Sequence, residues 1–205
     1  MLTAFTAGLL LITISELGDK TFFIAVILSM QHPRKLVFAG VTTALAAMTI
    51  LSVIFGKVVS FLPAKYIHYG EIVLFIAFGL KLLYDASKMP GAANQEVVEE
   101  AEEAVEKAGL GANEQKNIWS ILLKSFVLTF IAEWGDRTQI ATIALAASND
   151  PIGVTIGAVL GHSICAAIAV IGGKLIAGKI SEKQITFLGG CLFIIFGIVA
   201  ALEKS

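Results

Sequence analysis

The sequence of 205 residues contains little charge, little proline, few histidines and two cysteines. Only 15% of its residues are charged, well below the share of about a quarter in a soluble globular domain, whereas 57% are hydrophobic. A formal net charge of -1 gives no basic surface for phosphate backbones, so no nucleic-acid partner is expected. With a mean hydropathy of +0.84, the chain is expected to be a membrane protein in contact with the lipid bilayer.

The two cysteines, Cys165 and Cys191, both lie in apolar runs. Cysteine in such surroundings usually behaves as a small buried hydrophobic residue, so we expect neither a disulfide nor a metal site there. The N-terminal stretch MLTAFTAGLLLITI lacks a basic region and a small-residue cleavage site. We therefore expect a retained first span rather than a cleaved signal peptide.

Long apolar runs occupy most of the chain. A membrane-spanning helix needs about 20 mostly apolar residues. Six runs reach this length, at residues 2–30, 36–61, 67–87, 118–148, 152–177 and 184–202. The predicted fold class is therefore all-α, a polytopic membrane protein with six transmembrane helices.

One long segment, residues 88–117, is hydrophilic and carries seven glutamates. Its apolar residues recur at helical spacing, which predicts one short amphipathic helix: Val97, Val98, Ala101, Ala104, Val105 and Ala108. We interpret the segment as a solvated acidic linker, with a metal-collecting or regulatory segment as the alternative.

The linker divides the chain into two similar halves, residues 1–87 and 118–205. A shift of 117 residues places four residues of the first half on identical residues of the second: Glu16 on Glu133, Gly18 on Gly135, Asp19 on Asp136 and Thr21 on Thr138. Each half holds three predicted spans, an odd number, so the second half enters the membrane in the opposite sense. The sequence thus predicts an inverted-topology repeat, an architecture that places the substrate site near the bilayer midplane.

The distribution of lysine and arginine predicts the orientation, because cytosolic loops carry an excess of these residues. One side of the predicted topology has Arg34, Lys35, Lys81, Lys88, Lys107, Lys116, Lys124, Lys174, Lys179 and Lys183, and the other has Lys57, Lys65 and Lys204. We therefore expect the acidic linker in the cytosol and both termini on the extracytoplasmic side. A plasma membrane or an internal membrane such as the thylakoid fits this arrangement.

Two charged motifs interrupt the apolar runs, SELGDKT at residues 15–21 and AEWGDRT at residues 132–138. A charged group at membrane depth costs several kcal/mol unless it is paired or hydrated, so each motif is a functional hypothesis. In E-x-G-D the two acids are three residues apart, which predicts that both carboxylates lie on one face of a helix. The glycine can loosen that helix, and a broken helix is tolerated in a membrane where it lines a cavity.

Two such faces, meeting across the pseudo-two-fold axis, would bring four carboxylates together. These candidate metal ligands are Glu16, Asp19, Glu133 and Asp136. Further oxygen atoms are available nearby on Ser15, Thr21, Thr138 and Gln139. Such an all-oxygen site suits calcium, manganese or magnesium, and the sequence has no thiolate or histidine cluster of the kind that binds zinc or copper.

A basic residue follows the acids in each motif. Lys20 and Arg137 are spaced to form i,i+4 pairs with Glu16 and Glu133. Four acids against two bases leave a charge of minus two, which one divalent cation or two protons would neutralise. Competition between metal and protons for these carboxylates would couple their fluxes in opposite directions. The metal is then a transported substrate and no resident cofactor is expected.

Other readings of the motifs remain open. The charges could form buried salt bridges that hold the first and fourth spans together, or acidic rings that line a passive cation channel. From the enzyme class, Asp19 and Asp136 could be the two aspartates of an intramembrane aspartyl protease, although the glutamates of the motifs would then have no role.

The remaining polar residues of the spans carry weaker signals. A packing role is favoured over a proton relay for His162, and interfacial solvation is expected for Glu71 and Asp85 near the ends of the third span. A stripe of small residues on the fifth span predicts close helix packing: Gly153, Gly157 and Gly161.

The two motifs resemble the signature segments E-x-G-D-[KR]-[ST] of the transmembrane protein 165 family of cation/proton exchangers, which has Golgi, chloroplast and bacterial members. The resemblance covers both halves and the acidic middle segment, and neither motif departs from the pattern. It implies a transporter rather than an enzyme, one that exports manganese and calcium from the cytosol in exchange for protons. It also implies that both acids of each motif are essential. The short N-terminus is more similar to prokaryotic members, and the chain could work alone or as a homodimer.

Overall fold

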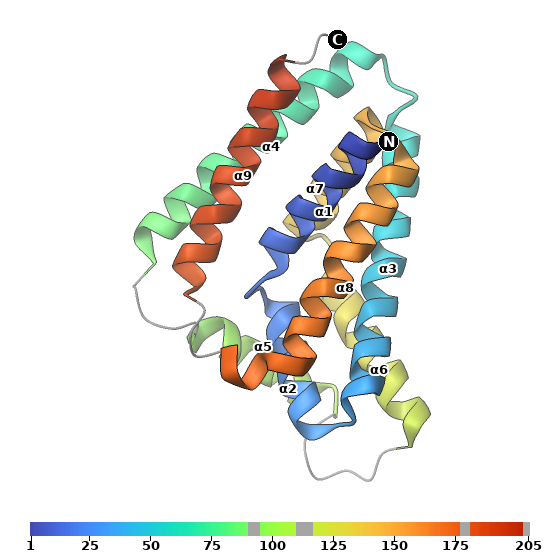
Figure 1. Cartoon of the computed structure of the whole chain (residues 1–205), viewed down its shortest axis with the longest axis vertical. Helices are drawn as coiled ribbons and strands as arrows, with labels where there is room; N and C mark the ends of the chain where they lie inside the picture. The colour runs from blue at the N-terminus through green and yellow to red at the C-terminus, as the bar shows by residue number, and fades with distance from the viewer. Residues whose placement is uncertain (90–94, 110–116, 177–180, 203–205) are drawn as a thin grey trace.

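The computed structural model describes residues 1–89, 95–109, 117–176 and 181–202. These residues form the helices α1 (Leu2–Glu16), α2 (Lys20–Gln31), α3 (Arg34–Val59), α4 (Ala64–Lys88), α5 (Gln95–Lys107), α6 (Ile118–Ala132), α7 (Arg137–Ser148), α8 (Pro151–Ile176) and α9 (Glu182–Leu202). Within those ranges there is no strand, so the predicted all-α class is confirmed (Figure 1). The predicted amphipathic helix of the acidic linker is α5.

Four helices, α3, α4, α8 and α9, are long and apolar enough to cross a membrane. A helix of 26 residues such as α3 is about 39 Å long, more than the hydrocarbon core of about 30 Å. Two of them, α4 and α9, leave many large apolar side chains exposed, as expected of helices that face lipid: Val73, Leu80, Phe187, Leu188, Ile195 and Ile198. The chain is therefore a multi-pass membrane protein.

The prediction of six transmembrane helices is confirmed only in part: within the described residues, four helices are long and apolar enough to span a membrane, or five if one bent pair counts as a single span. The predicted span 118–148 is this pair, α6 and α7, which meet at an angle of 76°. The predicted span 2–30 is also divided, into α1 with 15 residues and α2 with 12. Each break falls on an E-x-G-D motif, because a glycine there leaves the helical conformation.

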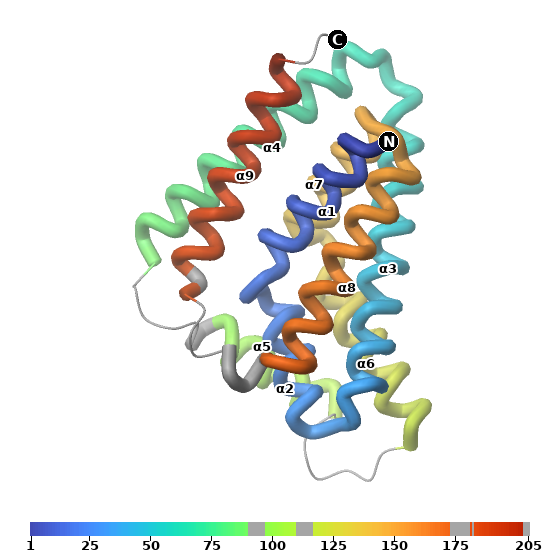
Figure 2. Tube along the Cα trace, in the orientation of Figure 1, coloured from blue at the N-terminus to red at the C-terminus, as the bar shows by residue number. Residues whose placement is uncertain are grey.

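Helices from the two halves of the chain pack against one another. Helix α1 lies against α8, α4 lies against α9, and α3 contacts α6, α7 and α8. Figure 2 shows that the partners in α1–α8, α3–α8 and α4–α9 run in pairs along the length of the molecule, with α3 opposite in direction to α8 and α4 opposite to α9. The core is thus built between the halves rather than within each half.

The helix bounds recur at the spacing of the sequence repeat. The bounds of α2 and α3 at residues 20–31 and 34–59 reappear 117 positions later as those of α7 and α8, at 137–148 and 151–176. One helix contact also recurs. A Cβ on Gly40 would lie 2.9 Å from the carbonyl oxygen of Leu122, and a Cβ on Gly157 would overlap the carbonyl oxygen of Phe5. These two contacts are 117 positions apart. The predicted close packing of the small-residue stripe is confirmed, because a Cβ on Gly153, Gly157 or Gly161 would meet residues of the N-terminal segment.

Four isolated side chains outside the motifs have distinct environments. Glu71 is only 7% exposed, so the expected interfacial solvation is wrong for this residue, because its side chain points into the helix packing rather than to the membrane surface. His162 is buried, and its Nδ1 has no hydrogen-bond partner among the described residues. Cys165 and Cys191 are free thiols. The side chains of four lysines used to predict the orientation lie outside the described residues: Lys116, Lys174, Lys179 and Lys204.

Candidate metal site

Each E-x-G-D motif folds into the same helix break. The glycines Gly18 and Gly135 have φ angles of 81° and 82°, in the left-handed region that other residues avoid. The backbone N–H of Asp19 donates to the carbonyl of Glu16 at 3.2 Å, and Asp136 donates to Glu133 at the same distance. The glutamate thus ends one helix and the aspartate occupies the N-cap of the next, a position that favours Asp.

The expectation that the two acids of a motif share one helix face is therefore wrong, because the glycine divides the helix between them. The break still brings carboxylates from both halves together. Ligand oxygens of Glu16, Asp19 and Glu133 all lie within 4.8 Å of one another. We call these three residues the carboxylate cluster. Both glutamates are only 2% exposed, whereas the side chain of Asp19 is 25% exposed.

Threonine hydroxyls occupy one oxygen of each glutamate. Thr21 donates to Oε2 of Glu16 at 3.2 Å, and Thr138 lies 3.5 Å from Oε2 of Glu133. The other oxygen, Oε1, is buried on both glutamates and has no hydrogen-bond partner among the described residues. Leaving buried polar atoms unpaired is costly, so these two oxygens are available to accept a cation or a proton.

The helices that follow the breaks contribute to the electrostatics of the cluster. Both α2 and α7 begin directly after the motif, at Lys20 and Arg137, so their N-terminal ends adjoin the carboxylates. A helix N-terminus carries a partial positive charge and unpaired N–H groups, which stabilise neighbouring anions. The two helix N-termini therefore offset part of the negative charge of the carboxylate cluster before any ion binds.

The basic residues do not form the predicted i,i+4 pairs. Arg137 instead reaches across the repeats, and its Nη2 donates to Oδ1 of Asp19 at 3.2 Å. Lys20 turns outward and pairs with Glu100 of α5 at 3.2 Å. The reason is again the break, which removes the continuous helical turn that an i,i+4 pair requires.

The remaining predicted site residues lie close by but in different roles. Asp136 does not belong to the carboxylate cluster, and its Oδ2 accepts from the backbone N–H and the hydroxyl of Thr138 at 3.2 and 3.0 Å. The amide of Gln139 is occupied, since its oxygen accepts from Gly135 N–H at 2.7 Å. The hydroxyl of Ser15 is buried and has no hydrogen-bond partner among the described residues.

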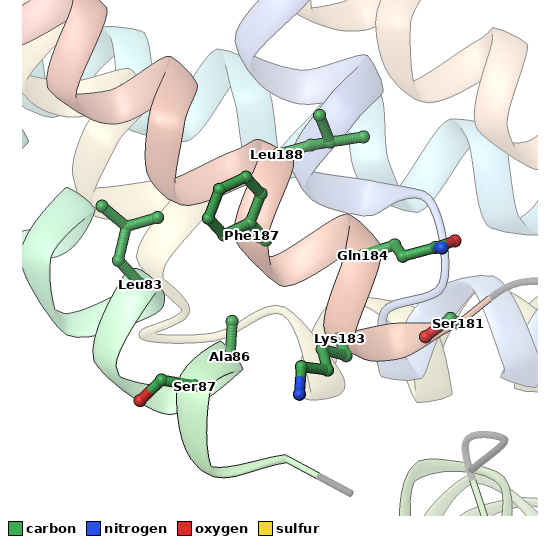
Figure 3. A pocket seen from close by; sticks show the side chains of 8 residues that line it. All are labelled: Leu83, Ala86, Ser87, Ser181, Lys183, Gln184, Phe187 and Leu188. Atoms are coloured by element: carbon green, nitrogen blue, oxygen red, sulfur yellow. The ribbon is translucent and has the colours of Figure 1, made fainter. Parts of the chain in front are cut away.

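Two cavities flank the ends of α4 and α9 that adjoin the linker. The larger, of about 760 Å³, has a mainly apolar wall, and among its described lining residues the charged one is Lys183 (Figure 3). The smaller, of about 100 Å³, contains Ser15, Asp19 and Arg137 in its lining and extends to Asp85 and Thr186. Only the smaller cavity therefore connects with the carboxylate cluster. Interfacial solvation is the prediction for Asp85, and nothing in the sequence indicates that its side chain lines this cavity.

Comparison with known proteins identifies the family of the chain. The family model described as divalent cation/proton antiporter GDT1 matches residues 4–90 and 121–205. GDT1-like protein sll0615 of Synechocystis sp. is 60% identical over 204 residues, covering 100% of this chain and 99% of that protein. No solved structure matches the chain.

Plant proteins are also similar. GDT1-like protein 4 of Oryza sativa subsp. indica is 46% identical over 202 residues, which are 95% of this chain and 72% of the rice protein. Protein PAM71-homolog, chloroplastic, of Arabidopsis thaliana is 43% identical over 209 residues, with 95% of this chain and 58% of that protein covered. The resemblance seen in the two motifs is confirmed, and it points to a family of transporters rather than of enzymes. The chain belongs to the GDT1 family of divalent cation/proton antiporters.

Proposed function

We propose that this antiporter exports Mn²⁺ or Ca²⁺ from the cytosol in exchange for protons, and that Glu16, Asp19 and Glu133 bind the cation. The observation that carries the proposal is the carboxylate cluster, with its ligand oxygens within 4.8 Å of one another. Each glutamate of the cluster keeps one buried oxygen without a partner among the described residues. Oxygen ligands of this kind suit hard divalent cations.

The charge of the cluster supports competition between metal and protons. Three carboxylates and the Arg137 guanidinium leave a formal charge of minus two. One divalent cation neutralises it, and so do two protons. A site that crosses the membrane interior only when neutral avoids the cost of moving buried charge. Cation and protons would then occupy the cluster in turn and move in opposite directions.

The proposal includes an inverted repeat, with residues 1–87 and 118–205 as the two halves and residues 88–117 as the cytosolic linker. The recurring helix bounds and the opposite directions of α3 and α8 support it. Under this symmetry Asp19 and Asp136 are equivalent, although one belongs to the carboxylate cluster and the other does not. We propose that they exchange these places as the site alternates between the two sides of the membrane, so that all four motif acids take part in transport.

The test is metal uptake into proteoliposomes under an imposed pH gradient, with Mn²⁺ and Ca²⁺ compared for the wild type, Glu16→Gln and Glu133→Gln. We expect uphill flux of at least one metal, which stops when the gradient is collapsed and is absent in both variants. Glu102→Gln is the matched control, because Glu102 is an exposed acid on α5. Flux that follows only the metal gradient would indicate a channel. Normal uphill flux in either glutamate variant would contradict the carboxylate cluster as the transport site.

A further inference from the structure

The smaller cavity lies between the linker end of the helix pair α4–α9 and the break between α1 and α2. Its lining joins residues from three parts of the fold. Ser15, Gly18 and Asp19 come from the break, Asp85 and Thr186 come from α4 and α9, and Arg137 comes from the start of α7. One wall of the cavity is thus part of the carboxylate cluster, and another is the last turn before the linker. The cavity is placed to connect the cluster with the linker side of the membrane.

Asp85 is in a position that helix stability does not explain. It lies in the last turn of α4, which ends at Lys88, and a negative charge there faces the partial negative charge of the helix C-terminus. Its side chain is partly exposed and lines the cavity. An acid that destabilises its own helix end and faces a polar cavity is placed to attract a cation.

A second, independent feature of the cavity also points to a ligand. The Ser15 side chain is only 5% exposed, lines the cavity, and has a hydroxyl oxygen without a hydrogen-bond partner among the described residues. Thr186, 8% exposed, lines the cavity as well. Asp85, Thr186, Ser15 and Asp19 thus all contribute to the lining of one cavity. Their side chains carry oxygen atoms, the kind of ligand that hard cations prefer.

The two cavities differ in the chemistry of their walls. The smaller, of about 100 Å³, has two carboxylates in its lining, Asp19 and Asp85, against the one guanidinium of Arg137. Among the described residues that line the larger cavity, of about 760 Å³, the charged side chain is that of Lys183 (Figure 3). Carboxylate oxygen attracts a hard divalent cation and an ammonium group repels it, so the ligand chemistry favours the smaller cavity.

We propose that the smaller cavity is the route by which the divalent cation reaches the carboxylate cluster from the linker side, and that Asp85 is its receiving residue. Asp85 exchanges part of the hydration shell for carboxylate oxygen before the ion moves to Asp19. This inference rests on the proposed function of the cluster. It assigns to Asp85 the capture of the ion and not its final binding. Because Mg²⁺ loses water reluctantly, such a route would also disfavour Mg²⁺.

The experiment measures initial rates of Mn²⁺ transport by the full chain in proteoliposomes, with the linker facing the added metal and its orientation checked by protease access. Removing one unit of charge from the route in Asp85→Asn is expected to raise the KM for Mn²⁺ about fivefold, with kcat unchanged. Asp85→Glu should restore the wild-type KM. Glu106→Gln, which removes an exposed acid of α5 on the same side, should leave it unchanged.

Three results would overturn the proposal: an unchanged KM in Asp85→Asn, a loss confined to kcat, or an equal rise in Glu106→Gln. Glu16→Gln in the same vesicles separates this proposal from the proposed function. If Glu16→Gln is inactive and Asp85→Asn has the wild-type KM, only the role of Asp85 is wrong. If Glu16→Gln transports normally, the carboxylate cluster itself is not the transport site.

Discussion

The two E-x-G-D motifs of this antiporter have the same backbone but different partners. Both glycines adopt the left-handed conformation, with φ angles of 81° and 82°, and both aspartates begin a helix. Yet Asp19 belongs to the carboxylate cluster and pairs with Arg137, whereas Asp136 accepts from Thr138, two residues further along the chain. The basic residues differ too, since Lys20 turns outward to Glu100.

This difference separates what the local sequence determines from what the packing determines. A glycine followed by an aspartate is sufficient to break a helix and begin the next one, so the two breaks agree. Which aspartate contacts the other half of the chain depends on how the halves are packed, so the contacts of Asp19 and Asp136 differ. A transporter whose halves alternate is expected to show such a difference in any one conformation.

The largest expected effect is the difference in Mn²⁺ affinity between variants of the two motif aspartates. Asp19→Asn should lower the affinity for Mn²⁺ about a hundredfold, or about 2.7 kcal/mol, because it removes one of the three carboxylates of the cluster. Asp136→Asn should change it by less than about threefold, or about 0.7 kcal/mol. Isothermal titration of the detergent-purified variants measures both. Equal losses in the two variants would mean that the two motifs contribute equally to the bound state.

The second prediction compares the two helix crossings made through glycine. Gly157→Ala should cost about 2 kcal/mol of stability, because overpacking a close helix contact is destabilising and the added Cβ meets the Phe5 backbone. Gly40→Ala should cost less, since its Cβ would lie 2.9 Å from the Leu122 carbonyl oxygen. Thermal unfolding in detergent compares them. Gly70→Ala is the control, because a Cβ there has no neighbour within 4 Å.

Sequence alone predicted the helical class, the division into two halves and the motif residues, because hydropathy and repeated motifs are properties of the chain itself. It placed each motif inside one apolar span with a glycine that can loosen the helix, but not the position of a break, since the apolar run at 118–148 continues on both sides of Gly135. Only the backbone conformation of that glycine divides the run. The cross-repeat pair of Arg137 with Asp19 could not be predicted, because the two residues are 118 positions apart and meet through packing.

The third prediction tests whether the breaks themselves are equivalent. Gly135→Ala should destabilise the fold by about 1 kcal/mol, the cost of left-handed backbone for a residue with a side chain. The cost is purely conformational, because a Cβ at Gly135 has no neighbour within 4 Å. Gly18 has nearly the same φ, so Gly18→Ala should include the same conformational cost. Chemical or thermal unfolding of both variants measures the difference. A Gly135→Ala variant at least as stable as the wild type would show that the break does not require glycine.

The smallest effect is expected at the basic residue that faces away from the cluster. The Lys20–Glu100 pair joins α2 to α5 through side chains that are 39% and 65% exposed, and exposed pairs of this kind contribute less than about 1 kcal/mol. Helix α5 is held mainly by its apolar face, where Ala101 and Val105 are buried against the core cluster that includes Phe22 and Phe23. Glu100→Gln should therefore change the free energy of unfolding by less than about 1 kcal/mol and the Mn²⁺ transport rate by less than about twofold. Arg137→Gln should abolish transport, because Arg137, the counterpart of Lys20 in the second motif, pairs with Asp19 of the carboxylate cluster. Equal effects in the two variants would mean that the exposed pair is as important to the transport cycle as the pair that touches the carboxylate cluster.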